Sequence, residues 1–261
     1  MSIKGTPLYV ISEETATLHL STGNSKIGHM FNFSTLPGNE AHLLILKNGQ
    51  ILTNISGTCS GFCEVCFNHG CYAVNSARLH HNKVIPAWAD NTLLLRNGKV
   101  WELLEDTLAK NAGKVKYFRI NVSGELRNVD DIIRWNTLAH NHPEVSFGVY
   151  TKNFDALDLF FQQYEDSEPN FCINVSQWNH VADEFLKKYP GKCNVFEYDP
   201  TNLKNCDWSE EERERLATLH HCPAVTEKGK HAKKPNGDPI LCDGCARCYR
   251  KTGGTTAVYA H

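Results

Sequence analysis

Between residues 99 and 219 the sequence alternates between helix-like and strand-like segments. Val100, Leu104 and Leu108 share one face of a helix, and the apolar run from Val115 to Val122 has the character of a buried strand. We expect further helices over 130–140, 156–164, 181–189 and after Ser209, and further strands over 145–150, 171–175 and 193–198. A repeat of roughly 25 to 30 residues predicts βαβ units with a parallel sheet. The expected fold is therefore α/β, as a partial or complete (β/α) barrel.

The segments on either side of this core differ from it in composition. Residues 1–55 combine short apolar stretches with turn signals such as Pro37-Gly38 and Asn48-Gly49, so we expect an N-terminal β-rich extension. Residues 56–219 form the predicted barrel-like core, with a cysteine loop at its start. Residues 220–261 form a cysteine-rich C-terminal tail with little apolar surface to bury, so a bound metal is expected to order it.

The charge balance excludes strong global attraction to nucleic acid or to an anionic membrane, because 27 basic residues face 29 acidic ones. The sequence shows neither a secretory signal nor an apolar run of membrane-spanning length, so we expect a cytoplasmic protein with no membrane contact. One basic loop, Lys228 to Lys234, is a candidate contact for nucleic acid. A solvated surface loop explains its lysines equally well.

Eleven cysteines are many for such a chain, and most of them fall into two groups. The first group is Cys59, Cys63, Cys66 and Cys71, and the second is Cys222, Cys242, Cys245 and Cys248. Clustered thiols in a reducing compartment usually hold metal rather than form disulfides. The sequence therefore predicts two metal sites and leaves three isolated cysteines without an assigned function, namely Cys172, Cys193 and Cys206.

The first group begins with the spacing C-x3-C-x2-C over Cys59, Cys63 and Cys66. A short loop with this spacing can wrap three thiolates around one face of a [4Fe-4S] cluster and leave the fourth iron open to another ligand. Cys71 would cap that iron if it also ligates, and the cluster would then be structural or electron-transferring. Zinc held by four thiolates is a further alternative.

This loop, with Phe67 behind its last cysteine, resembles the signature of the radical S-adenosylmethionine superfamily. Ser123-Gly124-Glu125 follows the predicted strand KYFRINV and resembles the glycine-rich acidic motif of that superfamily. The resemblance implies a barrel of the radical S-adenosylmethionine type, reductive cleavage of S-adenosylmethionine to a 5′-deoxyadenosyl radical, and a flavodoxin or ferredoxin as reductant. It implies cofactor contacts at Ser123, Gly124, Glu125, Thr151, Asn153 and Ser176. Cys71 departs from the pattern, and the later strands lack an obvious ribose-binding glycine motif.

A second resemblance, to a phage family called gene product eighty-eight, covers nearly the whole chain. It rests on LSTGNSKIGHMFNFS at residues 20–34, on Cys71-Tyr72-Ala73, on Ser123-Gly124-Glu125, and on the C-terminal cysteines followed by VYAH. This resemblance implies a phage protein acting in the cytoplasm of an infected bacterium, and it supplies no reaction.

The second cysteine group has the spacing C-x2-C-x2-C over Cys242, Cys245 and Cys248, with Cys222 as a fourth ligand. Full ligation by protein predicts a second [4Fe-4S] cluster that relays electrons or clamps the tail, with zinc as the alternative. Two functions stay open. One is a radical enzyme acting on an unknown substrate, and the other is a non-catalytic iron-sulfur or zinc protein that senses redox state or binds nucleic acid or a host protein.

Overall fold

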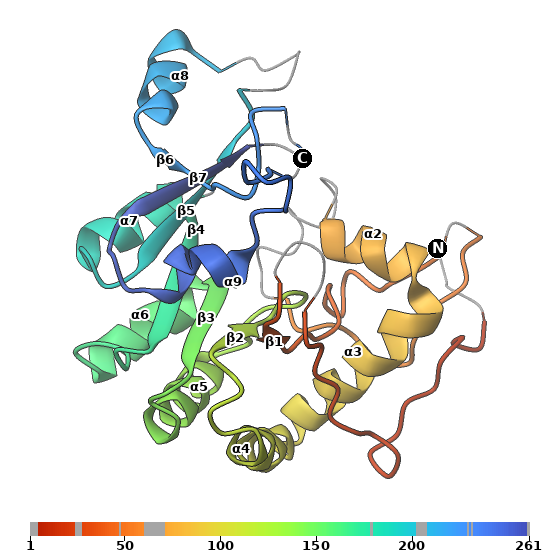
Figure 1. Ribbon diagram of the computed structural model, residues 1–261. Helices are drawn as coiled ribbons and strands as arrows, with labels where there is room; N and C mark the ends of the chain where they lie inside the picture. The colour runs from red at the N-terminus through yellow and green to blue at the C-terminus, as the bar shows by residue number, and fades with distance from the viewer. Residues whose placement is uncertain are drawn as a thin grey trace.

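The computed structural model describes residues 5–23, 28–46, 48–59, 71–177, 180–201, 208–228, 230 and 232–259. Within these residues a seven-stranded parallel sheet has the order β1-β2-β3-β4-β5-β7-β6 (Figure 1). Its strands are β1 (Phe31–Asn32), β2 (Tyr117–Ile120), β3 (Ser146–Thr151), β4 (Phe171–Gln177), β5 (Asn194–Asp199), β6 (His220–His221) and β7 (Thr255–Tyr259). The first five strands lie side by side in chain order, and β1 and β6 form the two edges of the described sheet.

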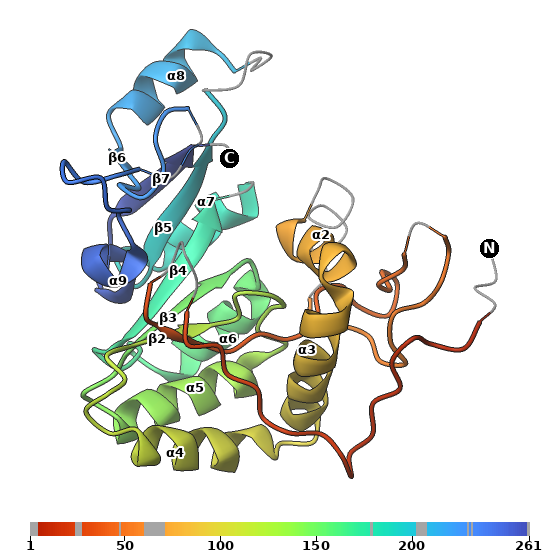
Figure 2. The same ribbon diagram turned by 45° about the vertical axis from the view of Figure 1, so that its right-hand side comes forward.

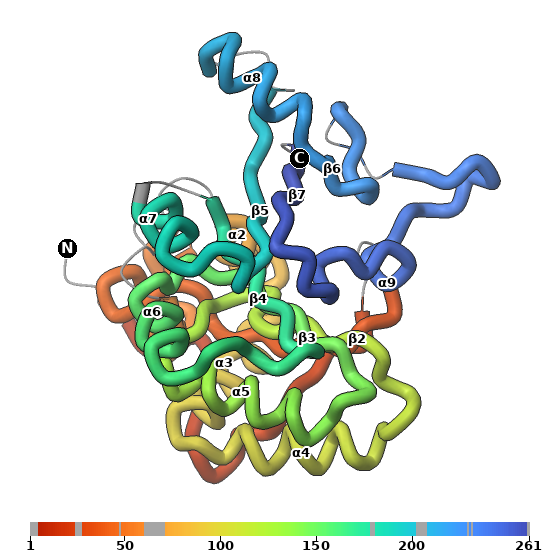
Figure 3. Tube along the Cα trace, turned by 90° about the vertical axis from the view of Figure 1, so that its left-hand side faces the viewer, coloured from red at the N-terminus to blue at the C-terminus, as the bar shows by residue number. Residues whose placement is uncertain are grey.

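The helices of the described residues are α2 (Tyr72–Leu79), α3 (His81–Arg96), α4 (Val100–Lys110), α5 (Val129–Asn141), α6 (Phe154–Gln163), α7 (His180–Lys188), α8 (Glu210–Ala217) and the short α9 (Cys242–Cys245). Helices α5, α6 and α7 each connect two consecutive strands and lie on one face of the sheet, whereas α9 lies on the other (Figures 2 and 3). In this part of the chain no helix is long and apolar enough to cross a membrane.

The helix-covered face of the sheet holds the main hydrophobic core. Phe118, Phe147 and Phe171 come from three neighbouring strands, and each is completely buried. Trp135 of α5 packs against them, with its ring centroid 5.8 Å from that of Phe118. Because alternate residues of a strand point to opposite faces, the residues between these aromatics lie on the other side of the sheet.

That other side, which we call the polar face, is lined by Tyr117 and Arg119 of β2, Gly148 and Tyr150 of β3, Cys172, Asn174 and Ser176 of β4, and Asn194 and Phe196 of β5. Buried polar groups are unusual here, since strands of parallel sheets are commonly apolar on both faces. The amide of Asn174 donates a hydrogen bond to the Cys248 carbonyl at 3.0 Å, and the amide of Asn194 donates one to the Arg250 carbonyl at 2.9 Å. Strand side chains therefore fix the C-terminal segment on the polar face.

Local sequence accounts for the helix starts. Ser209 caps α8, because its hydroxyl accepts a hydrogen bond from the Glu212 amide at 3.3 Å while the Glu212 carboxylate accepts one from the Ser209 amide at 3.4 Å. This reciprocal capping box begins the helix that the sequence predicts after Ser209. Asn128 starts α5 in the same way by accepting a hydrogen bond from the Asp131 amide at 3.1 Å.

The predicted alternation of parallel strands and helices is confirmed from β2 through β5. Helices α2 and α3 were not predicted, although Ile85 and Ala89 are completely buried along one face of α3. The described residues before Cys59 contain β1 and isolated bridges, such as the one between Tyr9 and Thr53.

The C-terminal tail joins the main sheet through β6 and β7. Strand β7 pairs with both β5 and β6, and its residues Ala257 and Val258 are buried. The sequence predicts that a bound metal orders this tail. The structure adds a second source of order, because the short segment TTAVY has the β-branched and apolar residues that favour a strand.

Candidate functional site

The first cysteine group starts at the carboxyl end of the sheet, next to the loop that follows β2. The hydroxyl oxygen of Thr58 accepts a hydrogen bond from the Glu125 amide at 2.9 Å and lies 2.8 Å from the hydroxyl oxygen of Thr35. Thr35 in turn donates its amide to the Ser123 carbonyl at 3.0 Å. The residue before Cys59 is thereby joined to the Ser123–Glu125 loop, at the end of the strands where open parallel sheets bind ligands.

Gly124 is required by this close approach. Its φ of 85° lies in the left-handed region. A Cβ at this position would lie 1.8 Å from the Thr35 hydroxyl oxygen and 2.6 Å from that of Thr58. Packing against the segment before Cys59 therefore accounts for the glycine of the Ser-Gly-acid motif.

The Glu125 carboxylate ties the loop after β2 to the end of β3. Its Oε1 accepts a hydrogen bond from the Leu126 amide and its Oε2 accepts one from the Lys152 amide, both at 2.9 Å. Burial raises the pKa of Glu125, and these amide hydrogen bonds oppose the rise. The side chain predicted to contact a cofactor is thus engaged with backbone amides.

The structure places the other predicted cofactor contacts at neighbouring strand ends. Asn153 caps α6 by accepting a hydrogen bond from the Ala156 amide at 3.2 Å, and its own side-chain amide donates to the Leu126 carbonyl at 2.8 Å. Thr151 ends β3 and accepts a hydrogen bond from the Asn153 amide at 3.0 Å. Ser176 lies one strand further along, buried on the polar face of β4. Cofactor binding by these residues stays a prediction.

Cys59 and Cys71 belong to the described residues, whereas Cys63 and Cys66 lie outside them. The Cys59 sulfur accepts a hydrogen bond from the Gly38 amide at 3.3 Å. Amide donors of this kind stabilise a thiolate and tune iron-sulfur clusters. Cys71 directly precedes α2 as its N-cap residue. Burial raises the pKa of the Tyr72 phenol, and the nearby thiols of Cys71 and Cys59 add to the rise. The two cysteines therefore belong to one neighbourhood.

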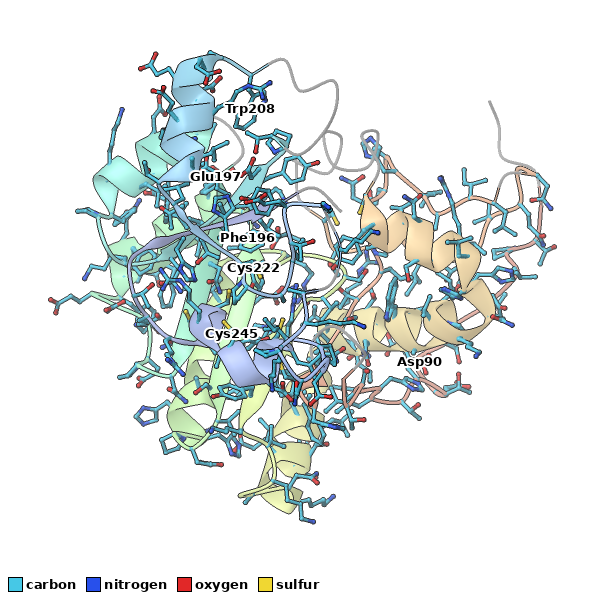
Figure 4. All side chains as sticks on the ribbon, turned by 45° about the horizontal axis from the view of Figure 1, so that its top comes forward. Asp90, Phe196, Glu197, Trp208, Cys222 and Cys245 are labelled. Atoms are coloured by element: carbon cyan, nitrogen blue, oxygen red, sulfur yellow. The ribbon has the colours of Figure 1, made fainter. Side chains whose placement is uncertain are left out.

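The second cysteine group lies on the side of the polar face. Cys242 and Cys245 are the ends of α9, and Cys248 lies in the 3-10 helix Arg247–Tyr249 that comes after it. Cys222 comes just after β6, and Figure 4 labels Cys222 and Cys245. Burial raises the pKa of the Cys248 thiol, a hydrogen bond with Tyr150 opposes this rise, and the thiols of Cys222 and Cys245 add to it. Cys222 and Cys245 are thus each close enough to Cys248 to influence its thiol.

Among the described residues, no three Cys, His, Asp or Glu side chains are arranged to hold a metal ion. All four cysteines of the second group belong to this part of the chain. Their chemistry suits a [4Fe-4S] cluster or zinc, but their positions do not form a ligand sphere. Metal binding there would require these cysteine side chains to rearrange into a common ligand sphere.

The segment around residues 28–30 lies against the second cysteine group. The amide of His29 donates a hydrogen bond to the Asp243 carboxylate at 2.9 Å. Gly28 lies so close that a Cβ would be 2.3 Å from the carboxylate carbon of Asp243. Met30 joins a small buried cluster with Tyr249, Tyr117, Cys242 and Cys248. The N-terminal motif and the C-terminal cysteines are therefore neighbours in space.

Arg119 and Tyr249 were missed by the sequence analysis. The signal for Arg119 is a charged residue in the middle of the strand YFRI. Its guanidinium carbon lies 4.6 Å from the centroid of the Tyr150 ring. Burial by itself lowers the pKa of Arg119. The surrounding tyrosines, Tyr150 foremost, raise it by more than burial lowers it, so the pKa of Arg119 lies above its usual value. The group therefore remains a cation between the two cysteine groups.

The basic loop of the tail lies on the surface. Lys228, Lys230, Lys233 and Lys234 are exposed, and His231 lies outside the described residues. Nucleic-acid binding by this loop stays a prediction.

A profile of the family described as Gene product 88 matches residues 18–251. The chain belongs to the Gene product 88 family. The match includes the N-terminal motif, the sheet up to β6 and the second cysteine group, and it confirms the predicted resemblance to this phage family. The radical S-adenosylmethionine resemblance of this Gene product 88 protein stays a prediction. No curated protein and no solved structure matches the chain.

Proposed function

We propose that this Gene product 88 protein is an iron-sulfur protein in which Cys59, Cys63 and Cys66 hold a [4Fe-4S] cluster at the carboxyl end of a partial (β/α) barrel. The proposal is carried by the 2.9 Å hydrogen bond from the Glu125 amide to Thr58, which fixes the start of the cysteine loop at the ligand-binding end of the sheet. The chain order of strands β1 to β5 supports the barrel, since (β/α) barrels are built from parallel strands in sequence.

The chain's own residues have distinct tasks in this proposal. The Gly38 amide supports the Cys59 thiolate, while Glu125 and Asn153 hold the loops around it in place. The buried hydroxyl oxygen of Ser123 has no hydrogen-bond partner among the described residues, so it is available to a cofactor, and Ser176 is buried one strand further along. An open-iron cluster supplies the reductive cleavage of S-adenosylmethionine when both are bound. The reductant is a flavodoxin or ferredoxin of the infected bacterium.

The second cysteine group is proposed to bind a second [4Fe-4S] cluster or zinc with protein ligands alone. Its function is to clamp the tail or to relay electrons. Asn174 and Asn194 already fix the tail on the polar face. Loss of this second metal is therefore expected to leave the sheet folded.

A fully capped first cluster is the second candidate, and the position of Cys71 favours it. Cys71 is the N-cap residue of α2, and its thiol and that of Cys59 both raise the pKa of the Tyr72 phenol. Ligation by four thiolates leaves no open iron for S-adenosylmethionine. The protein would then sense redox state or bind nucleic acid or a host protein, without catalysing a reaction.

Iron and sulfide counts on three cysteine variants separate these candidates. In anaerobically purified protein, Cys63→Ala is expected to lose one cluster, whereas Cys71→Ala should keep the wild-type content. Cys193→Ala is the matched control, because Cys193 is a buried cysteine outside both groups. Equal iron loss from the Cys63 and Cys71 variants would establish the capped cluster. Wild-type protein that binds zinc and no iron would overturn the iron-sulfur proposal.

A further inference from the structure

Six buried side-chain polar atoms of the described residues lack a hydrogen-bond partner, and four of these belong to the polar face and its margin. They are Nε of Arg119, Oδ1 of Asn121, the hydroxyl oxygen of Ser123 and the phenol oxygen of Tyr249. Buried polar atoms in folded proteins are nearly always hydrogen-bonded, because an unpaired one has lost its water without compensation. A concentration of such atoms points to a ligand that completes them.

The pairing of β2 with β3 brings the main members of this group together. Arg119 lies directly beside Gly148 in the register of the two strands. The ring of Tyr249 lies over Gly148, where a Cβ would be 2.7 Å from a ring carbon. Glycine at this position therefore lets the Tyr249 ring pack onto β3 at the residue that is in register with Arg119. The Tyr150 ring supports the guanidinium from the neighbouring position.

The backbone at the end of β2 gives a second, independent indication. Asn121 has a φ of 52°, a left-handed conformation that is uncommon for residues other than glycine. The chain there turns toward β1, and the Val122 amide donates a hydrogen bond to the Phe33 carbonyl at 3.2 Å. Unusual backbone conformations of this kind concentrate at ligand sites. Asn121 combines such a conformation with an unpaired buried oxygen.

The Arg119 guanidinium gives the site a positive charge. Arg119 forms no ion pair with any carboxylate of the described residues. The Arg119 side chain is only partly buried, but its Nε is buried and unpaired, so an anionic group that accepts its hydrogen bond would complete it.

We propose that the polar face binds a small ligand through a carboxylate or phosphate group, which accepts hydrogen bonds from Arg119, Tyr249 and Ser123. Asn121 accepts a hydrogen bond from a hydroxyl or amine of the same ligand. Arginine suits this role because its planar N–H groups match the oxygens of carboxylates and phosphates. The site lies between the two cysteine groups but requires no metal, so it stands independently of the proposed clusters.

Isothermal titration calorimetry of the full chain, in a chloride buffer free of other oxyanions, tests this proposal with sodium phosphate and sodium acetate in separate titrations. One of the two anions is expected to bind at a single site. Phosphate binding alone assigns a phosphate ligand, and acetate binding alone assigns a carboxylate. Arg119→Met should weaken the affinity by about tenfold or more, and Tyr249→Phe by about threefold or more. Arg134→Met, on the exposed side of α5, is the matched control and should bind like the wild type.

Three safeguards keep the test decisive. Arg119→Lys preserves the charge and Tyr249→Phe preserves the ring over Gly148, so these variants report on binding even if Arg119→Met is unstable. Melting curves identify any unfolded variant. Iron is counted on the same samples, because lost anion binding at unchanged iron content separates this site from the proposed cluster. The proposal is overturned if neither anion binds the wild-type protein, or if folded Arg119→Met and Tyr249→Phe bind as tightly as the wild type.

Discussion

The two faces of the sheet are built on opposite physical principles. On the helix-covered face, Phe147 and its neighbours are completely buried among apolar side chains. On the polar face, the same strands carry buried amides, a cation and unpaired polar atoms, and the unpaired atoms cost stability rather than add to it. Strand β3 shows the division residue by residue, because Phe147 and Val149 face the core whereas Gly148 and Tyr150 face the C-terminal segment. One face therefore holds the fold together, and the other is suited to recognition.

Substitution on the helix-covered face should have the largest effect on stability. Phe147→Ala is expected to lower the free energy of unfolding by about 3–5 kcal/mol, because it removes a fully buried ring and leaves a cavity. Tyr150→Phe, on the other face of the same strand, should cost only about 0.5–1.5 kcal/mol for a lost hydrogen bond. Urea unfolding of both variants measures the difference. Equal losses would break the distinction between the two faces.

Gly148→Ala should have an intermediate effect that is specific to the polar face. The new Cβ would lie 2.7 Å from a carbon of the Tyr249 ring, so we expect a loss of about 1–3 kcal/mol from overpacking. Removing the ring as well, in Gly148→Ala/Tyr249→Ala, relieves this clash, so the double variant should lose less than the sum of the two single losses. Urea unfolding of the three variants checks this coupling, and strictly additive losses would show that Tyr249 does not depend on Gly148.

The sequence predicted the helix-covered face much better than the polar face, and the reason is the range of the contacts. Apolar periodicity is a local signal, so strands β2 to β5 and the helices α5 and α6 were found from short windows, whereas β6 and β7 were not predicted. The contacts of Tyr249 with Gly148 and of His29 with Asp243 join residues that are far apart in the chain, and no local pattern announces them. Helix α3 was missed because Pro86 interrupts its pattern, although the helix continues through it.

The two cysteine groups also show that a local pattern does not predict contacts between distant parts of the chain. Their spacing indicated metal ligation, and the structure places Cys59 at the carboxyl end of the sheet as the βαβ pattern leads one to expect. Spacing alone does not show whether Cys222 reaches the ligands on α9, because that distance depends on how β6 joins the sheet. Nor does the sequence indicate that both carboxylate oxygens of Glu125 accept hydrogen bonds from backbone amides.

The smallest predicted effect on stability concerns Asp199 and His221, which are hydrogen-bonded to each other, unlike the unpaired polar atoms around Arg119. Burial would raise the pKa of Asp199, but hydrogen bonds from Thr201 at 2.6 Å and from His221 at 2.7 Å outweigh it and hold the pKa below its usual value. Because the folded pKa is depressed, this stabilisation is complete above the unfolded pKa of about 3.9 and is lost as the pH falls through the folded pKa.

Asp199→Asn should therefore remove part of the acid sensitivity, on the order of 1 kcal/mol. Urea midpoints measured between about pH 2.5 and pH 6 test the change, since only the wild type should lose this contribution below about pH 4. An identical decline in both proteins would mean that Asp199 contributes nothing to the acid sensitivity.

Electron paramagnetic resonance on anaerobically purified, dithionite-reduced protein tests the open-iron cluster most directly, with iron and sulfide counted on the same sample. The proposed [4Fe-4S] cluster on Cys59, Cys63 and Cys66 predicts a signal that shifts when S-adenosylmethionine is added, because the cofactor binds the open iron. An iron-rich sample whose signal does not move would contradict the open iron and favour ligation by Cys71.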